Sequence, residues 1–349
     1  MDDNLKNIVN DYINKNLLDF NNIKTNSLDG KNYIDSILNR LLSRKWSRKA
    51  QTEDAKQYTT EKVQHIVENN LPFIFCYCFG GYKHFWSTSY PEPDWAEIFT
   101  IKYLIEYLLP IAESYNPGLT LEFESEEVAL SLMNNVPQEG LDKYNLAFKK
   151  LISYIKEKTN YPIDFNLVLA KDFYNKEELI KKMYEYLPVV ENRFKELSDE
   201  EKQIRLKRAE TNILWNGIED LTKLTEDEKK QKIYNSRILN ESFLDMDYEL
   251  RGKEYFEKEN LIPLLGTFGL GAGGEAWVHI ASTSSSFVDF WTGIGILEIR
   301  GDKIIHKIIS QKQYDQIKDK LVKVELENEL TKISDNYSYI YVYEGTLQF

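Results

Sequence analysis

A glycine pair followed by a lysine is the most suggestive chemical feature of this sequence. The run Gly80-Gly81-Tyr82-Lys83 directly follows an apolar segment. Glycines without a Cβ let the backbone turn and let a ligand approach the amides closely. A lysine at this position can hold a phosphate or a carboxylate, or can lose its proton if it is desolvated. The alternative interpretation is an exposed loop lysine.

Two acids follow this loop at a spacing of three residues. Asp94 comes directly after Pro93, and an apolar pattern with helical steps of three and four begins at Trp95. Asp94 is therefore expected to cap this helix, with Glu97 at the capping-box position. Whether the two acids only cap the helix or also take part in a functional site stays open. Between the lysine and the acids, Ser87 is a further candidate binding residue.

Two later segments combine polar and aromatic side chains. Arg208, Asn212 and Trp215 fall on one side of a predicted helix, which suits ligand binding and interface packing about equally. Trp291 stands among aromatic residues and glycines on a predicted strand. That combination fits the wall of a small-molecule site or a tight sheet corner.

Other known site motifs are absent from the sequence or lie in the wrong predicted secondary structure. The run Gly269–Gly274 matches G-x-G-x-x-G, but that motif opens a helix, whereas 275–280 alternates as a strand does. We therefore expect no dinucleotide cofactor and interpret 266–274 as a loop or lid. The four histidines lie far apart without partners at metal-ligand spacing, so no metal site is expected. The only cysteines, Cys76 and Cys78, fit buried core thiols.

The elements that must position these residues form a βαβ plan. The uncharged run from Leu71 to Phe79 predicts a strand buried on both faces. A helix of about 20 residues follows from Asp94, the turn 115–118 ends it, and 119–123 predicts a second strand. Ligand sites of open α/β sheets lie where strands end in loops, so the Lys83 loop is the first place to look.

The rest of the chain predicts a Rossmann-like α/β fold with a mixed sheet flanked by helices. We expect a helical segment over 1–70 and a single composite domain over 71–349. Within that domain, 176–260 is mainly helical, and 261–349 is strand-rich but broken by a helix near 311–326. Ser125 is expected to cap another helix that begins in the acids after it.

Composition limits the classes of function. The chain has 349 residues, enough for a substantial core, and its net charge of −12 argues against broad nucleic-acid binding. We see no signal peptide and no apolar run long enough to span a membrane, which predicts a cytoplasmic protein. The sequence leaves the oligomeric state open.

In the order of its motifs, the segment 71–151 resembles the isocyanide (isonitrile) synthases. It combines an apolar strand, a loop with Lys83 and serines, and the run Pro93-Asp94-Trp95-Ala96-Glu97. A long helix, Tyr115-Asn116-Pro117-Gly118, a strand with Ser125, and Tyr144 follow in the same order. Members of that family convert an amino acid's amine to an isonitrile, with ribulose 5-phosphate as carbon donor.

The resemblance implies an enzyme that takes an amine substrate and a phosphorylated co-substrate, without cofactor or metal. Lys83 would hold an anion or polarise a carbonyl, and Asp94 and Glu97 would lie close to the substrate amine. The face with Arg208 and Asn212 could complete the phosphate clamp. On this view Lys83→Ala abolishes turnover and leaves the melting temperature nearly unchanged. A non-catalytic binding or partner protein of a biosynthetic or toxin system, and a transferase with a nucleotide-linked donor, are the alternatives.

Overall fold

The computed structural model describes residues 3–23, 25–46, 53–79, 83–215, 220–265, 278–279 and 293–347. The chain divides into two compact units. The first comprises Met1–Ser125, Asp142–Val168 and Glu259–Phe349, and the second comprises Glu126–Leu141 and Leu169–Lys258. Trp291, the glycine pair 80–81, Tyr82 and the Gly-rich loop 266–274 lie outside the described residues.

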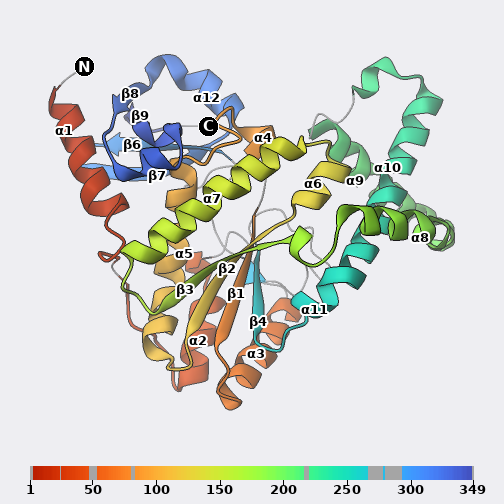
Figure 1. Ribbon diagram of the computed structural model, residues 1–349, viewed down its shortest axis with the longest axis horizontal. Coiled ribbons are helices and arrows are strands. Elements are labelled where there is room, and N and C mark those ends of the chain that lie inside the picture. The colour runs from red at the N-terminus through yellow and green to blue at the C-terminus, as the bar shows by residue number, and fades with distance from the viewer. Residues whose placement is uncertain are drawn as a thin grey trace. The chain divides into compact units, whose positions relative to one another are not determined.

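A five-stranded sheet with the order β3-β2-β1-β4-β5 forms the centre of the first unit (Figure 1). Its strands are β1 (Phe73–Phe79), β2 (Leu119–Ser125), β3 (Ile163–Leu169), β4 (Leu261–Leu265) and β5 (Val278–His279). β1 pairs in parallel with β2 and with β4, and β4 pairs in parallel with β5. The expected α/β fold with a helix-flanked sheet is therefore confirmed.

The βαβ plan is present as the sequence predicts. Helix α5 (Trp95–Ser114) connects β1 to β2, and the two strands pair from Phe73 opposite Leu119 to Phe79 opposite Ser125. The side chains of Phe73, Phe75, Cys76 and Tyr77 are fully buried, as expected of a strand covered on both faces. The carboxyl end of β1 leads to helix α4 (Lys83–Trp86), so Lys83 lies at the end of a central strand.

Further helices pack around this sheet. They are α1 (Asp3–Tyr12), α2 (Tyr33–Leu41), α3 (Glu53–Glu68) and α7 (Gln138–Lys158), and α1 continues in a π-helical turn, Ile13–Leu17. One continuous apolar core contains side chains from α1, α2, α3, α5, α7 and both sheets of the first unit. No helix among the described residues combines the length and apolarity needed to cross a membrane.

A second sheet with the order β7-β6-β9-β8 follows in the C-terminal third. Its strands are β6 (Ile294–Arg300), β7 (Lys303–Ile309), β8 (Val322–Glu325) and β9 (Tyr339–Glu344), shown in blue in Figure 1. The predicted helix near 311–326 is wrong in its second half. Helix α12 spans only Gln311–Ile317, and the alternating run Val322–Glu325 pairs antiparallel with β9 and buries Val324.

The second unit is mainly helical, in agreement with the helical pattern of 176–260. It contains α6 (Glu127–Met133), α8 (Lys176–Glu196), α9 (Asp199–Trp215), α10 (Glu226–Asp247) and α11 (Lys253–Tyr255). The predicted serine cap of α6 is wrong. Its N-cap residue is Glu126, without a side-chain cap, whereas Ser125 ends β2 and donates a hydrogen bond to Asn145 Oδ1 at 3.2 Å.

His306 on β7 ties the second sheet to α1 and α5. Its Nε2 lies 2.8 Å from the Tyr12 hydroxyl, and its ring stacks on Phe99 with centroids 4.4 Å apart. Burial, with a smaller contribution from Lys102, lowers the pKa of His306 from 6.5 to about 4. The folded protein therefore holds this imidazole neutral at pH values where the unfolded chain takes up a proton.

The difference in the pKa of His306 between the folded and the unfolded chain predicts that acid destabilises the protein. Between about pH 6.5 and pH 4 only the unfolded chain binds the proton, so the free energy of unfolding should fall by about 3 kcal/mol as the pH is lowered. Urea denaturation of the wild type and of His306→Gln across this interval measures the effect. If the two proteins keep a constant difference in stability, the imidazole does not contribute to the pH dependence.

Candidate functional site

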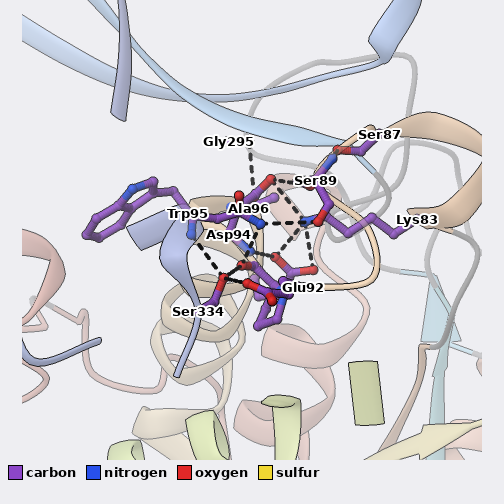
Figure 2. A network of polar contacts seen from close by, with 12 residues as sticks. Lys83, Ser87, Ser89, Glu92, Asp94, Trp95, Ala96, Gly295 and Ser334 are labelled. Carbon is purple, nitrogen blue, oxygen red and sulfur yellow. Dashed lines mark hydrogen bonds and ion pairs between the residues drawn. The ribbon is translucent and has the colours of Figure 1, made fainter. Parts of the chain in front are cut away.

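The ammonium group of Lys83 is buried between two carboxylates. Its side chain has no exposed surface, and Nζ lies 2.9 Å and 2.8 Å from the two carboxylate oxygens of Glu97. Lys83 Nζ also lies 3.1 Å from Asp94 Oδ2 (Figure 2). The alternative of an exposed loop lysine is therefore wrong. Within the first unit, the lysine at the end of β1 and the acids at the start of α5 form one cluster.

Asp94 and Glu97 cap α5 in the predicted way. The Asp94 side chain accepts a hydrogen bond from the backbone N–H of Ala96 at 2.7 Å, and Glu97 Oε2 accepts one from the backbone N–H of Asp94 at 2.8 Å. This capping box is confirmed. Because the same two carboxylates also pair with Lys83, the helix cap and the ionic cluster are one arrangement.

Glu97 is the most perturbed acid of the cluster. Its side chain is fully buried, and Oε1 also accepts a hydrogen bond from the Tyr144 hydroxyl on α7 at 2.8 Å. Burial raises the pKa of Glu97 from 4.5 to about 7; the Lys83 charge opposes the increase and the Asp94 charge adds to it. Near neutral pH this carboxyl can therefore both accept and release a proton.

Two serines extend the cluster. Ser89 Oγ donates to Asp94 Oδ2 at 2.9 Å and lies 2.6 Å from Ser87 Oγ, so Ser87 is the donor in that second contact (Figure 2). A continuous polar path therefore runs from Ser87 through Ser89, Asp94, Lys83 and Glu97 to Tyr144. Such a path is chemically suited to proton transfer over several groups.

The second sheet holds the cap of α5 in place. The backbone N–H of Gly295 on β6 donates to Asp94 Oδ1 at 3.3 Å. A Cβ at Gly295 would lie 2.4 Å from the backbone nitrogen of Ala96, so only glycine fits this approach. The neighbouring strand β9 also contacts the start of α5, since Trp95 Nε1 donates a hydrogen bond to the backbone oxygen of Tyr339 at 2.7 Å.

A cavity of about 120 Å³ adjoins Asp94 and Ser89. We call it the Asp94 cavity. Its wall includes Trp95 and the three tyrosines Tyr314, Tyr339 and Tyr341. Glu92 and Ser334 support the loop beside it, since Ser334 Oγ lies within hydrogen-bond distance of Glu92 Oε2 (3.0 Å) and of the Pro93 oxygen (2.9 Å).

The structure brings together some of the residues predicted from the sequence. Lys83, Asp94, Glu97 and Ser87 share one network. Arg208 and Asn212 lie on α9 in the second unit. Among the described residues, no three histidine, cysteine or acidic side chains are grouped so that they could hold a metal ion.

Three residues of the network are not among the site residues predicted from the sequence. Tyr144 contributes a hydroxyl, Ser89 a hydrogen bond to Asp94, and Gly295 a backbone amide. The sequence does give a hint of two of them. Ser89 lies two residues from Ser87, and Tyr144 is one of the positions that carry the resemblance to the isocyanide synthases. The role of Gly295 depends on a contact between residues 201 positions apart in the chain and has no local signal.

The fold of this chain is similar to that of a solved protein structure. The chain is similar to the PvcA protein from Pseudomonas aeruginosa, with a TM-score of 0.60 and 12% sequence identity over 88% of this chain and 99% of that one. At this level of identity the likeness shows a shared fold. No protein-family model and no curated protein matches the sequence.

Two other solved structures match at much lower TM-scores. Tyrosyl-tRNA synthetase from Aeropyrum pernix gives 0.30, with 12% identity over 69% of this chain and 55% of that one. A CDPS from Fluoribacter dumoffii gives 0.27, with 11% identity over 58% and 80% of the two chains.

Burial changes the expected effect of replacing Lys83. Removing the ammonium leaves two buried carboxylates without their cation, so Lys83→Met should lower the free energy of unfolding by about 3–5 kcal/mol. Adding Glu97→Gln should recover much of this loss, because one of the uncompensated charges is then removed. Urea denaturation of both variants measures the two values. A loss below about 1 kcal/mol in Lys83→Met would contradict the buried ion pair.

The raised pKa of Glu97 predicts that its contribution to the free energy of unfolding changes with pH in the opposite direction to that of His306. Between about pH 4.5 and pH 7 the folded protein retains a proton that the unfolded chain releases, so the Glu97 contribution to stability falls as the pH rises. Relative to Glu97→Gln, the wild type should lose on the order of 3 kcal/mol of stability over this interval. Thermal or urea unfolding of both proteins tests this, and a flat difference would disprove the shift.

Proposed function

We propose that this chain is an isonitrile-synthase-like biosynthetic enzyme that condenses the amine of an amino acid with a ketose phosphate such as ribulose 5-phosphate. The observation that carries the proposal is the buried cluster of Lys83, Asp94 and Glu97 where β1 ends and α5 begins. This is the end of a parallel sheet at which open α/β folds bind their ligands. The order of motifs along 71–151 and the fold likeness to PvcA support the same proposal.

The first chemical step suits the groups of this cluster. The amine nitrogen attacks the ketose carbonyl carbon, the carbonyl electron pair moves to oxygen, and the nitrogen loses a proton. A carboxylate takes up that proton and returns it to the oxygen, which becomes a hydroxyl group. A second proton lets this group leave as water while the nitrogen lone pair forms the C=N bond, and the nitrogen then releases its second proton. Glu97 fits both roles because its pKa of about 7 lies near neutral pH. Asp94 and Ser89 would orient the amine.

The other groups of the site would act through the carboxylates of Asp94 and Glu97. Lys83 would keep the two carboxylates close together and adjust their basicity, since its ammonium group contacts both. Tyr144 would share its proton with Glu97 during turnover. Ser87, the segment 80–82 and Trp291 would contact the substrates. No group of this proposal requires a metal ion or a cofactor.

Product analysis tests the proposal directly. The purified chain is incubated with ribulose 5-phosphate and each amino acid in turn, and the products are examined for isonitriles by mass spectrometry. We expect one amino acid or a small group of them to react. Glu97→Gln should lower turnover by about 100-fold or more, because the proton-transfer group is lost.

A matched substitution at the surface serves as the control. Glu259→Gln removes a carboxylate whose side chain is 65% exposed, and it should leave turnover unchanged. Absence of isonitrile with all amino acids would favour a binding protein without this activity. Equal turnover in the wild type and in Glu97→Gln would remove Glu97 from the mechanism.

A further inference from the structure

We infer that the turn 334–339 holds the loop 87–93 in place, and that Asn336 is the residue of this turn that positions Ser89 and Asp94 for the reaction. We call this turn the C-terminal clasp. The inference deepens the proposed function, on which it rests only for the statement that the positioned groups take part in catalysis. Its basis is the set of hydrogen bonds between the two segments.

The loop 87–93 connects α4 to α5 and makes few of the contacts that would fix its own shape. Within it, the backbone N–H of Glu92 donates to the Ser89 oxygen at 3.1 Å. Pro91 and Pro93 have no N–H group to donate. The loop therefore depends on other elements of the fold to hold its polar side chains in place.

The side-chain amide of Asn336 joins the two ends of this loop. Its Nδ2 donates to the backbone oxygen of Ser89 at 3.2 Å and to that of Pro93 at 3.4 Å. An amide nitrogen carries two hydrogens, so it can make both contacts at once. Asn336 Oδ1 accepts a hydrogen bond from the Tyr339 hydroxyl at 3.4 Å. Both ends of the amide are thus engaged within the protein, and Asn336 acts on a substrate through the loop.

The two carbonyl groups that Asn336 holds lie next to the acid cluster. Ser89 donates its hydroxyl to Asp94 Oδ2 at 2.9 Å, and Pro93 directly precedes Asp94 in the chain. A movement of either carbonyl therefore moves the donor to Asp94 or the N-cap of α5 itself. Because Asp94 also contacts Lys83, such a movement reaches the whole cluster.

Other residues of the clasp hold the same part of the chain. The backbone N–H of Asp335 donates to Glu92 Oε2 at 3.3 Å, the oxygen that Ser334 Oγ also contacts (Figure 2). At the other end of the clasp, the Tyr339 backbone oxygen accepts the indole N–H of Trp95. Contacts of the clasp are therefore spread along the loop and the start of α5.

The clasp is itself anchored. Ser334 Oγ accepts a hydrogen bond from the Asn336 N–H at 3.1 Å, where the short 3-10 helix Asp335–Ser338 begins. Asn328 Nδ2 donates to the Tyr337 backbone oxygen at 2.8 Å, and the Tyr337 side chain is fully buried. A turn that is fixed in this way can impose a defined position on the loop it contacts.

Kinetics of two variants of the full chain test the assignment. Asn336→Asp keeps the size and the acceptor of the side chain but removes the Nδ2 donor, and Asn336→Ser removes the amide without adding a charge. We expect kcat for isonitrile formation to fall about tenfold or more in both, with KM changed less than about threefold, because misplacement by about 1 Å slows the reaction strongly. Thermal unfolding checks the fold, and if the aspartate variant does not fold, the serine variant decides.

Asn328→Asp is the matched control. It removes the amide donor to Tyr337 but retains the oxygen that accepts the Leu330 N–H, and neither of these contacts involves the loop 87–93. It should leave kcat unchanged even where it lowers the melting temperature. An equal fall of kcat in Asn328→Asp and in the Asn336 variants would trace the effect to a general loss of stability and would overturn the inference.

Hydrogen exchange measures the loop without any substrate. The N–H groups of Glu92 and Ala96 are hydrogen-bonded within the loop and the helix cap, so a peptide covering 86–97 reports on both. In Asn336→Ser these amides should exchange about tenfold faster than in the wild type, whereas Asn328→Asp should match the wild type. Unchanged exchange over 86–97 in Asn336→Ser would disprove the clasp.

The clasp and the proposed function can fail separately. If the wild type forms no isonitrile with any amino acid, the proposed function fails, and hydrogen exchange alone decides on the clasp. If the wild type forms isonitrile and both Asn336 variants keep its kcat, the function stands and the positioning role is wrong.

Discussion

The burial of the Lys83 ammonium group is the constraint on which the candidate site depends. A charge without solvent contact is stable only when opposite charges and hydrogen bonds surround it closely. Asp94 and Glu97 meet this requirement from the first turn of α5, while the lysine comes from the helix that follows β1. The ion pairs therefore fix α4 relative to α5, the helix that leads back to the next strand.

This arrangement gives each acid two tasks. As a capping box, the acids satisfy backbone N–H groups that the helix leaves without partners, and negative charge is favourable at that end of the helix dipole. As partners of Lys83, they form a buried group with an excess of negative charge. Burial, and to a smaller extent the Asp94 charge, raises the pKa of Glu97, so its ionisation is unfavourable despite the Lys83 ammonium group.

The second sheet completes the site from a distant part of the chain. Gly295 brings the backbone of β6 to the start of α5, and the backbone oxygen of Tyr339 accepts the Trp95 indole N–H. The tyrosines of β9 and α12 form one wall of the Asp94 cavity. The strand-rich C-terminal third thus has a role in shaping the pocket, in addition to burying apolar surface.

The sequence by itself determined the elements near the site. The uncharged run of β1, the helical period after Asp94 and the spacing of Asp94 and Glu97 predict the strand, the helix and its capping box, because these features depend on neighbours a few residues apart. Only the tertiary structure decided that Lys83 is buried in an ion pair, that Tyr144 joins Glu97, and that Val322–Glu325 is a strand. Those outcomes depend on which distant segments pack together, and burial, charge pairing and strand pairing are properties of that packing.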